Sequence, residues 1–384
     1  MKFHRYIFRN FQDQLITGKA YLILGPRRSG KSVLLQDIKR DLFPESILLN
    51  GEDPNVSNLL LQSSIGQIRQ LLGTKKLLMI DEAQKIQGIG NIVKLMLDEI
   101  GNLSVILTGS SAFDLQNRFG EPLTGRKKTY YLYPMSQLEF SATESILETN
   151  EMLEERMVFG GYPEVWQYPD RISRIEYLNE LANDYLYKDV LILDNIRNAG
   201  KLQALLRLLA FQIGKEVSND ELGRQIQMSR NTVDKYLDLL SKVFVIFKIS
   251  GFSRNLRKEV TKNSRWYFYD NGILNTLLTN FTPLVNRSDV GSLWENYLIS
   301  ERLKSQSYQH QYSQNYFWRT YDRQEIDWVE DINGQLTGYE IKWQEKKMSP
   351  PSAWRKAYPG AEYKVIHRQN YLDWLCVQAV QETV

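Results

Sequence analysis

Gly25-Pro-Arg-Arg-Ser-Gly-Lys-Ser32 is the stretch that decides the fold of this 384-residue chain. It directly follows Ala-Tyr-Leu-Ile-Leu, residues 20–24, a short apolar run of the kind that forms a buried strand. Residues 33–38 then place apolar side chains at a spacing that gives a helix one apolar face. A G-x-x-x-x-G-K-[ST] pattern between a strand and a helix predicts a loop that binds phosphate groups.

The residues of this loop have distinct expected parts in holding a nucleotide. The glycines let backbone N–H groups turn inward around phosphate oxygens, and the following helix adds positive partial charge at its N-terminus. We expect Lys31 to reach the β- and γ-phosphates and the Ser32 hydroxyl to coordinate Mg²⁺. The predicted ligand is therefore ATP with Mg²⁺. The predicted binding residues are Gly25, Pro26, Arg27, Arg28, Ser29, Gly30, Lys31 and Ser32.

Two acidic residues, Asp81 and Glu82, end another apolar run, Leu77–Ile80. A carboxylate at that strand end can lie beside the phosphate loop and bind Mg²⁺ through water, and the next one can polarise the attacking water. We therefore expect Asp81 to assist Mg²⁺ binding and Glu82 to act as the general base. Acidic pairs also occur in ordinary solvated turns, so this assignment depends on the upstream loop.

Hydroxyl and guanidinium groups further along the chain extend the expected site. The run Val105–Leu107 ends in Thr108-Gly-Ser-Ser111, whose hydroxyls can contact the γ-phosphate or only cap a turn. We favour Ser110 for the catalytic contact. Arg118 and Arg126 are candidates for the charge that stabilises the phosphoryl transition state, from the same chain or a neighbouring subunit. Exposed arginines are otherwise mostly solvated.

Short apolar runs recur along the first third of the chain. Runs at 47–49, 77–80 and 105–107 are separated by helical patterns at roughly 57–72 and 91–101. Strands that alternate with helices predict a parallel sheet covered on both faces. The strand signal disappears from about residue 136, and residues 151–210 are mostly helical.

A second pattern begins near residue 214 and predicts a helix-turn-helix followed by a hairpin. Ser218-Asn-Asp-Glu221 reads as a capping box, and Ser229 is the expected N-cap of the next helix. The runs 243–249 and 265–269 are the two expected strands. Together these elements match the pattern of a winged helix.

This winged helix carries basic residues at positions suited to nucleic acid. Contacts to base edges would come from the second helix, and contacts to phosphates from the loop between the strands. Such a unit can equally present a solvated face to a protein partner. The helix residues are Arg230, Asn231 and Lys235, and the loop residues are Arg254, Arg257, Lys258, Lys262 and Arg265.

The tail, from about residue 286, holds a second chemical pattern. Glu295 lies on a predicted helix, Asp327 on a strand, and Glu340 and Lys342 on the strand after an Asn333-Gly334 turn. Strand alternation points positions 340 and 342 to the same face. Carboxylates of Asp327 and Glu340 are suited to Mg²⁺ or Mn²⁺, with Lys342 beside the reacting phosphate, which suits metal-assisted phosphodiester hydrolysis. A solvated Glu-Lys pair on an edge strand is the alternative.

The composition narrows the environment in which such a protein works. A net charge of +3 does not by itself indicate nucleic-acid binding. Cys376 is the single cysteine, which excludes an intramolecular disulfide, and the three histidines lack zinc-ligand spacing. The N-terminus shows no signal-peptide pattern and no stretch is long enough to span a bilayer. We therefore expect a cytoplasmic protein without a membrane partner.

The whole chain resembles a family of bacterial and archaeal AAA-type ATPases whose C-terminal half is a domain of unknown function. The resemblance rests on the loop at 25–32 and on a series of short motifs along nearly the full length. These are Ile-Asp-Glu-Ala-Gln-Lys85, Leu-Thr-Gly-Ser-Ser111, Leu-Thr-Gly-Arg126 with Tyr-Pro-Met-Ser136, Gly-Gly-Tyr-Pro-Glu164, Tyr-Asp-Asn-Gly272, Trp-Glu-Asn296, Glu-Ile-Asp327 and Glu-Ile-Lys342.

The resemblance implies an α/β protein of four parts. These are an AAA-like P-loop core at 1–135, a helical lid at 136–210, a winged helix at 211–285 and a restriction-endonuclease-like domain at 286–384. The tail pattern of that fold, a helical Glu, then Asp, then Glu-x-Lys, maps onto Glu295, Asp327, Glu340 and Lys342.

Two functions from different classes remain open at this stage. In the first, ATP turnover controls an attached nuclease-like domain that is directed to double-stranded DNA. In the second, the chain is an ATP-driven switch or regulator whose tail only binds a partner. A transcriptional DNA reader and a homo-oligomer are further expectations.

Overall fold

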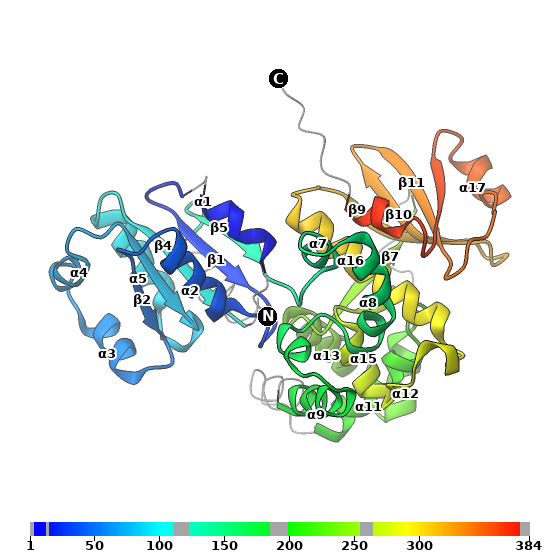
Figure 1. Cartoon of the computed structure of the whole chain (residues 1–384), viewed down its shortest axis with the longest axis horizontal. Helices are drawn as coiled ribbons and strands as arrows, with labels where there is room; N and C mark the ends of the chain where they lie inside the picture. The colour runs from blue at the N-terminus through cyan, green and yellow to red at the C-terminus, as the bar shows by residue number, and fades with distance from the viewer. Residues whose placement is uncertain (1–3, 13–14, 111–122, 185–198, 254–263, 377–384) are drawn as a thin grey trace. The chain divides into compact units, whose positions relative to one another are not determined.

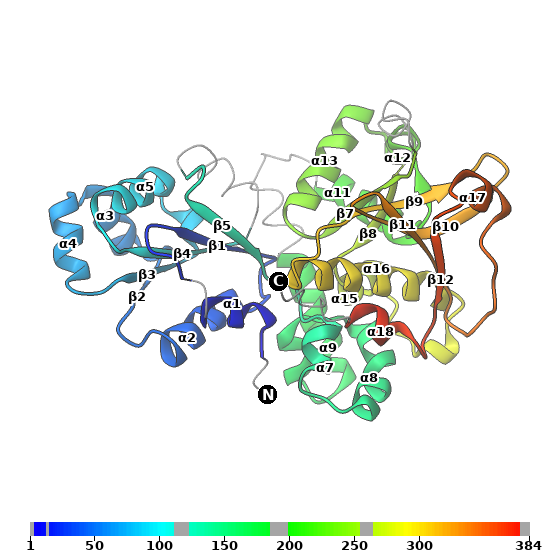
Figure 2. The same ribbon diagram turned by 90° about the horizontal axis from the view of Figure 1, so that it is seen from above.

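The computed structural model describes residues 4–12, 15–110, 123–184, 199–253 and 264–376 (Figures 1 and 2). The chain divides into two compact units. Unit 1 comprises Met1–Met135 with Lys242–Phe244, and unit 2 comprises Ser136–Ser241 with Val245–Val384.

Unit 1 is built on a five-stranded parallel sheet in the order β2-β3-β4-β1-β5. The first apolar run along the chain, Ala20–Leu24, is the fully buried strand β1 between β4 and β5. Figure 2 shows α2 (Lys31–Asp41) on one side of the sheet and α3 and α5 on the other. The predicted parallel α/β fold is confirmed. The other strands are β2 (Ile47–Asn50), β3 (Leu77–Asp81), β4 (Ser104–Gly109) and β5 (Lys127–Tyr131).

Two features of unit 1 differ from the sequence prediction. The helix expected at 57–72 is two helices, α3 (Pro54–Gln62) and α4 (Ile65–Leu72), because Ser64 starts a new helix with a capping box to Gln67. The strand β5 was not predicted, because only Tyr130 among its five residues is buried and no apolar run marks it. The later helix α5 (Ile89–Glu99) lies close to its expected range.

Unit 2 begins with helices and ends with a mixed sheet. The helices are α7 (Gln137–Ser141), α8 (Ile146–Phe159), α9 (Arg171–Leu181), α11 (Ala199–Phe211), α12 (Asn219–Ile226), α13 (Arg230–Lys242), α15 (Asn271–Leu278), α16 (Val290–Tyr308), α17 (Ser352–Ala357) and α18 (Tyr371–Leu375).

The helix-turn-helix elements lie where the sequence predicted them. Thr232 N–H donates to Ser229 Oγ at 3.2 Å, so Ser229 caps α13 as expected. The predicted capping box at Ser218 is wrong, because its side chain accepts no cap hydrogen bond although α12 begins directly after it. The hairpin consists of β7 (Ile246–Gly251) and β8 (Ser264–Phe268), which pair antiparallel.

One seven-stranded sheet, in the order β12-β11-β10-β9-β7-β8-β6, runs through unit 2. The hairpin joins the tail strands because β7 pairs in parallel with β9, Ser250 opposite Tyr316. The strands at 211–285 and those at 286–384 therefore share one sheet. The remaining strands are β6 (Glu216–Val217), β9 (Gln314–Arg319), β10 (Glu325–Ile332), β11 (Gln335–Ile341) and β12 (Glu362–Ile366).

The predicted hairpin at Asn333-Gly334 joins β10 to β11. Both turn residues have positive φ, 54° and 87°, as a two-residue hairpin turn requires. The antiparallel pairing of β10 with β11 confirms this prediction.

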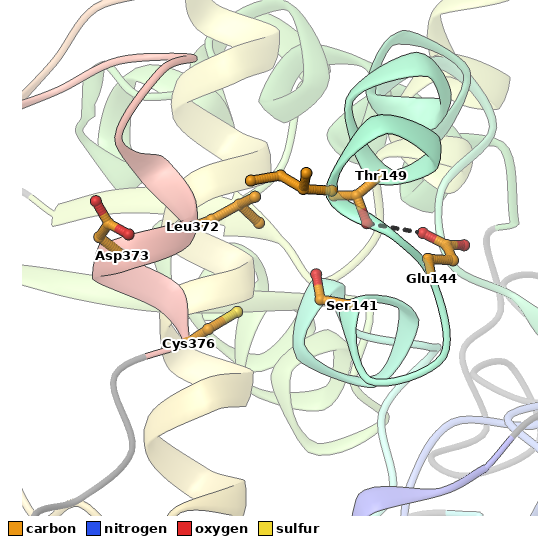
Figure 3. A pocket seen from close by; sticks show the side chains of 7 residues that line it. Ser141, Glu144, Thr149, Leu372, Asp373 and Cys376 are labelled. Atoms are coloured by element: carbon orange, nitrogen blue, oxygen red, sulfur yellow. Dashed lines mark hydrogen bonds between the residues drawn. The ribbon is translucent and has the colours of Figure 1, made fainter.

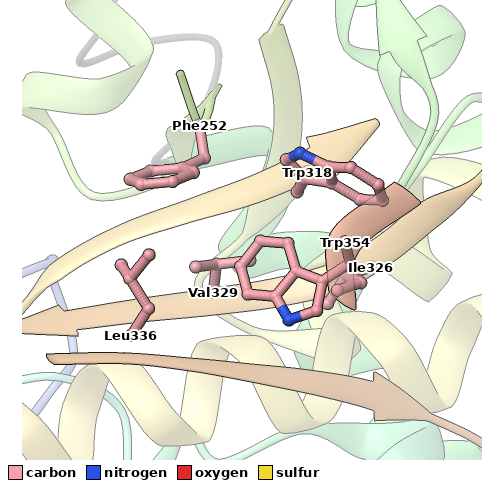
Figure 4. Packing of buried hydrophobic residues seen from close by; sticks show 6 residues of the cluster. All are labelled: Phe252, Trp318, Ile326, Val329, Leu336 and Trp354. Carbon is pink, nitrogen blue, oxygen red and sulfur yellow. The ribbon is translucent and has the colours of Figure 1, made fainter. Parts of the chain in front are cut away.

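A compact hydrophobic cluster lies against the tail strands (Figure 4). Ile326 and Val329, an odd number of residues apart on β10, both belong to it. Strict alternation would point them to opposite faces, but the pairing of β10 with β9 shifts register between them. The members are Phe252, Trp318, Ile326, Val329, Leu336 and Trp354.

Three of the short motifs quoted above meet in the interior of unit 2. Asp270, from the Tyr-Asp-Asn-Gly motif, accepts a hydrogen bond from the Gly161 N–H at 2.7 Å. Asn271 Nδ2 donates to the carbonyls of Met157 and Leu293, and Asn296 Nδ2 donates to Asn271 Oδ1 at 2.7 Å. Because buried polar groups must be paired, these motifs stabilise the packing of α8, α15 and α16.

Candidate functional site

The predicted phosphate loop lies at the carboxyl end of β1 and leads into α2. Its backbone takes left-handed conformations at Arg28, φ 63°, and Gly30, φ 95°. Such turns direct successive N–H groups to one side, which makes an anion-binding concavity. A Cβ at Gly25 would lie 2.0 Å from the Leu132 carbonyl oxygen, so only glycine fits there.

Lys31 lies inside this loop. The residue is only 4% exposed, and its Nζ donates hydrogen bonds to the carbonyls of Gly25 at 3.0 Å and Pro26 at 2.8 Å. Burial lowers the pKa of Lys31 to about 8, although Glu82 and Asp81 act to raise it. An anion in the loop would favour the charged ammonium.

Two serines of the loop fit the expected ligand in different ways. Ser32 is exposed on the first turn of α2, where its hydroxyl is accessible to a hydrated cation. Ser29 Oγ is buried and has no hydrogen-bond partner among the described residues. A buried unpaired hydroxyl in a phosphate-binding loop fits a ligand that supplies its partner.

Arg5 is a residue of this site that the sequence analysis missed. Its guanidinium is buried and donates to the Ser29 carbonyl at 2.5 Å and the Tyr133 carbonyl at 2.6 Å. It thereby fixes the backbone of the loop to the segment after β5. No sequence motif surrounds Arg5, so only the folded chain reveals this contact.

The ends of β3 and β4 lie side by side and bring the predicted acidic residues together with hydroxyls. Thr108 Oγ1 donates to Asp81 Oδ1 and accepts a hydrogen bond from the Glu82 N–H at 2.9 Å. Glu82 has a φ of 46°, a left-handed conformation that is uncommon for a residue with a side chain.

The predicted hydroxyl, Ser110, accepts a hydrogen bond from Gln84 Nε2 at 3.2 Å. The same nitrogen donates to Glu82 Oε2 at 2.5 Å. Thr108 and Gln84 are therefore two further members of the site. The signal for Gln84 was its place two residues after Glu82 in the Asp-Glu-Ala-Gln motif.

The donors present fit a nucleotide with its magnesium ion. Mg²⁺ at such sites keeps several waters and takes few protein ligands, the rest coming from phosphate oxygens. The hydroxyl of Ser32 and the carboxylate of Asp81 would be the protein groups that hold the magnesium ion, directly or through water. Among the described residues, no group of three or more His, Cys, Asp or Glu side chains is arranged to hold a metal ion without such phosphates.

The predicted arginine Arg126 does not lie at this site. Its carbonyl accepts a hydrogen bond from the Ala20 N–H, at the end of β1 opposite to Gly25. Its guanidinium pairs with Asp98. The prediction that Arg126 acts on the phosphates of its own chain is therefore wrong, and a role in a neighbouring subunit stays a prediction. Arg118 lies outside the described residues.

In unit 2, the four predicted tail residues lie close together. Lys342 Nζ is 2.6 Å from Glu340 Oε1 and 3.6 Å from Asp327 Oδ2, and the Ile341 N–H donates to Asp327 Oδ2 at 2.9 Å. Glu295 comes from α16 and accepts a hydrogen bond from the Tyr267 hydroxyl at 2.7 Å.

Arg265 joins this cluster and corrects its predicted place on the wing. Its side chain is 4% exposed and lies 2.8 Å from Glu325 Oε2 and 3.8 Å from both Glu295 Oε1 and Asp327 Oδ1. It is therefore a buried counter-ion instead of an exposed phosphate contact. The other wing residues, Arg254, Arg257, Lys258 and Lys262, lie outside the described residues.

Burial perturbs the acid–base properties of this cluster. Burial, with the nearby Asp327 carboxylate, raises the pKa of Glu295 to about 8. Burial also raises the pKa of Asp327 and of Glu340. Burial acts to lower the pKa of Lys342, but Asp327 and Glu340 raise it above its ordinary value. Perturbed groups of this kind occur both at functional sites and in buried ion-pair networks.

The carboxylates of the cluster already have cationic partners within the protein. Arg265 and Lys342 approach the same oxygens that a divalent ion would need. A divalent ion would have to displace these cations, so the assignment of Asp327 and Glu340 as metal ligands stays a prediction.

The predicted base-reading helix has a mixed surface. Arg230, Asn231 and Lys235 are exposed on α13, as expected, but so are Asp234 and Asp238. Arg230 lies 3.5 Å from Asp220 and 3.9 Å from Asp234. The exposed face of α13 therefore is not uniformly basic.

A cavity of about 390 Å³ lies elsewhere in unit 2, between α7, α8 and α18 (Figure 3). Thr149 Oγ1 donates to Glu144 Oε2 at 3.0 Å on its wall. None of the predicted site residues lines it. The lining residues are Ser141, Glu144, Ile146, Thr149, Leu372, Asp373 and Cys376.

None of the helices in the described part of the chain combines the length and apolar character that a membrane-spanning segment needs.

Curated relatives of the chain are uncharacterised prokaryotic proteins. A protein of Methanocaldococcus jannaschii is 27% identical over 266 residues, which cover 64% of this chain and 60% of that protein. A Mycobacterium tuberculosis protein is 24% identical over 324 residues, covering 84% and 69% respectively. A Haemophilus influenzae protein is 26% identical over 292 residues, covering 69% and 71%. The chain thus spans about 60% of the archaeal relative.

Two solved structures show remote similarity. The Pif1 helicase from Candida albicans matches with a TM-score of 0.25 and 15% identity, over 47% of this chain and 54% of the helicase chain. A STAND (Signal Transduction ATPase with Numerous Domains) protein with a tetratricopeptide repeat sensor from Pyrococcus horikoshii matches with a TM-score of 0.30 and 12% identity, over 79% of this chain and 46% of the STAND chain. TM-scores this low carry no argument about function.

Family models divide the chain into three matched segments. Residues 17–141 match an AAA domain, residues 150–284 match a domain of unknown function (DUF8612), and residues 290–371 match another (DUF4143). The first segment contains the phosphate loop and the ends of β3 and β4. Residues 17–141 are thus similar to AAA domains, and residues 150–284 and 290–371 are similar to two families of unknown function.

Proposed function

We propose that the protein binds and hydrolyses ATP at the loop Gly25–Ser32, using Mg²⁺. The observation that carries this proposal is the buried ammonium of Lys31 within a loop of left-handed turns, next to the carboxylates at the end of β3. Carbonyl-bound Lys31 would exchange its partners for phosphate oxygens, because these carry a full negative charge opposite to that of the ammonium, whereas the carbonyls are neutral.

Each residue would have one role in this reaction. Backbone N–H groups of the loop and Lys31 would hold the phosphates, and Ser32 and Asp81 would hold the magnesium ion. Glu82 would accept the proton of the attacking water. The Thr108 bonds to Asp81 and to the Glu82 N–H would fix these two neighbours relative to each other.

The test is ATP turnover by the purified full-length chain in Mg²⁺. Lys31→Ala and Glu82→Gln are each expected to lower kcat by about 10²- to 10³-fold, since each removes a group that acts on the reacting phosphate or water. Lys75→Ala, an exposed lysine on the loop before β3, is the matched control and keeps wild-type turnover. Turnover unaffected by Lys31→Ala would contradict the proposal.

For unit 2, we propose that the cluster around Arg265 responds to the nucleotide state and binds a partner. The buried pairing of Arg265 with Glu325, Glu295 and Asp327 favours this reading over a nuclease, because the internal cations compete with a metal ion. The chain would then be an ATP-driven switch.

The second candidate is a nuclease-like activity on double-stranded DNA, controlled by ATP. It is supported by the convergence of Glu295, Asp327, Glu340 and Lys342. It predicts cleavage of plasmid DNA in Mg²⁺ or Mn²⁺ that Asp327→Ala and Lys342→Ala abolish while ATP turnover continues. If neither metal supports cleavage with or without ATP, the nuclease proposal is contradicted and the proposal of an ATP-driven switch is retained.

DNA binding is tested separately through its salt dependence. Contacts to phosphates make affinity fall steeply as salt concentration rises. Neutralising Arg254, Arg257 and Lys258 together would then reduce the salt slope by about three. Binding that does not depend on salt would count against a DNA-directed role.

A further inference from the structure

Gln84 is a buried polar residue in unit 1 to which the proposed mechanism gives no role. It lies in the short 3₁₀ helix η2 (Ala83–Lys85), directly after β3, and is only 5% exposed. Its Nε2 donates to Glu82 Oε2 at 2.5 Å and to Ser110 Oγ at 3.2 Å. The amide thus bridges the end of β3 to the end of β4.

Both hydrogen bonds can form at once. A primary amide carries two N–H donors on one nitrogen, one for each acceptor. The bond to Glu82 is charge-assisted when that carboxylate is ionised, which makes it the stronger of the two. The side chain of Gln84 is therefore well suited to fix one oxygen of Glu82 and leave the other to a water molecule.

The backbone of Glu82 is fixed from a second direction. Its N–H donates to Thr108 Oγ1 at 2.9 Å, and its φ of 46° is left-handed. A residue in this conformation is retained only where its surroundings determine it. Thr108 therefore holds the backbone of Glu82, and Gln84 holds its carboxylate.

From this geometry, we infer that Gln84 is the positioning residue for the general base Glu82. The inference rests on the proposed ATP hydrolysis. In this role Gln84 acts through Glu82 and not on the nucleotide: it sets the direction in which Glu82 receives the proton of the attacking water. A carboxylate displaced by about 1 Å can cost about a hundredfold in rate, so its orientation matters as much as its presence.

The first experiment separates catalysis from binding. Gln84→Leu keeps the approximate volume and removes both donors. We expect kcat for ATP to fall by about 10- to 100-fold, while the Kd for Mg·ADP, measured by calorimetry, stays within about twofold of wild type because the phosphate loop is unchanged. Gln87→Leu, an exposed neighbour, is the matched control and keeps wild-type kcat.

The second experiment asks whether Gln84 acts through Glu82. Single-turnover hydrolysis of radiolabelled ATP is measured for Glu82→Gln with and without Gln84→Leu. If Gln84 works only by orienting the carboxylate, the double variant hydrolyses ATP as fast as Glu82→Gln alone. A purely structural role would instead lower the rate by the same factor in both backgrounds.

The outcomes separate this inference from the proposed function. If Glu82→Gln is inactive but Gln84→Leu keeps its kcat, or if Kd weakens in proportion to kcat, the inference is overturned and the ATPase stands. If the wild-type protein does not hydrolyse ATP, both the inference about Gln84 and the proposed ATPase function are contradicted. Gln84→Met serves as a second variant, and urea unfolding of each variant confirms that it is folded.

Discussion

Lys31 shows how one residue can be both predicted and unexpected. Its place in the loop followed from the sequence pattern, but its pKa of about 8 follows from burial that the pattern does not reveal. The same holds for Glu82, whose left-handed backbone is a property of the folded chain.

The lowered pKa predicts that nucleotide binding takes up a proton. Below pH 8 the Lys31 ammonium is charged, and above pH 8 the free protein increasingly loses its proton. Because bound phosphate favours the charged form, the Kd for ADP should rise with pH above 8, by up to about tenfold per pH unit. Calorimetric titrations at pH 6.5 to 9.5, with EDTA to exclude metal ions, measure this.

Lys31→Arg is the matched control for this prediction. Arginine keeps a positive charge over the whole pH range, so its Kd for ADP should stay level above pH 8. A wild-type Kd that does not change between pH 7 and pH 9.5 would show that Lys31 does not titrate at the phosphates.

The residues that sequence reasoning missed or misplaced share a physical cause. Arg5 acts through contacts that only the fold creates, and no local pattern marks it. Gln84 lies in the Asp-Glu-Ala-Gln motif, but its hydrogen bond to Ser110 on the neighbouring strand end depends on the fold. Arg265 was expected both to begin the strand 265–269 and to contact phosphates with the basic residues of the preceding loop. It lies on β8, as the strand prediction had it, but it is buried with carboxylate partners from α16 and β10 and is not an exposed phosphate contact.

At the scale of elements, the glycine turn that ends α8 is important for the packing of α8 against α15 in unit 2. Gly160 has a φ of 74°, and a Cβ there would lie 2.1 Å from Asp270 Oδ1. Asp270 in turn caps α15, accepting from the Ile273 N–H at 3.2 Å. The end of α8 therefore packs closely against the Asp270 carboxylate that caps α15, and a side chain at position 160 would displace this carboxylate.

Gly160→Ala should destabilise unit 2 by about 2–4 kcal/mol, from backbone strain and displacement of Asp270. The measurement is the free energy of unfolding in urea, followed by tryptophan fluorescence. Gly291→Ala is the matched control, since a Cβ there meets nothing within 4 Å and alanine favours the first turn of α16. Equal stability of the two variants would contradict the role of this turn.

Elements with a strong periodic signal were predicted well, and those fixed by partners were not. β1, β3 and β4 are buried apolar runs and were identified from sequence. β5 carries two lysines and a threonine, and it is a strand because β1 offers it an open edge. The pairing of β7 with β9 joins residues more than sixty positions apart, which no local pattern can encode.

At the scale of the whole molecule, the chain consists of two compact units. The proposed switch requires that nucleotide binding to unit 1 changes the conformation or dynamics of unit 2. We expect Mg·ATP to slow amide hydrogen exchange in peptides covering 25–36 and 81–85, because bound phosphate orders the loop. If nucleotide controls unit 2, peptides covering 264–268 and 325–342 should also change their exchange rates.

Lys31→Ala is the control for this experiment, because it should remove both changes. Slower exchange confined to unit 1 in the wild-type chain would leave the ATPase intact. It would contradict the proposal that the nucleotide state reaches the cluster around Arg265.

The most direct measurement is calorimetric titration of the folded Glu82→Gln chain with Mg·ATP, since this variant should bind without turnover. The account predicts saturable binding of one nucleotide per chain, weakened at least tenfold by adding Lys31→Ala. No detectable binding of Mg·ATP or Mg·ADP to well-folded protein, or equal binding with and without Lys31, would contradict it.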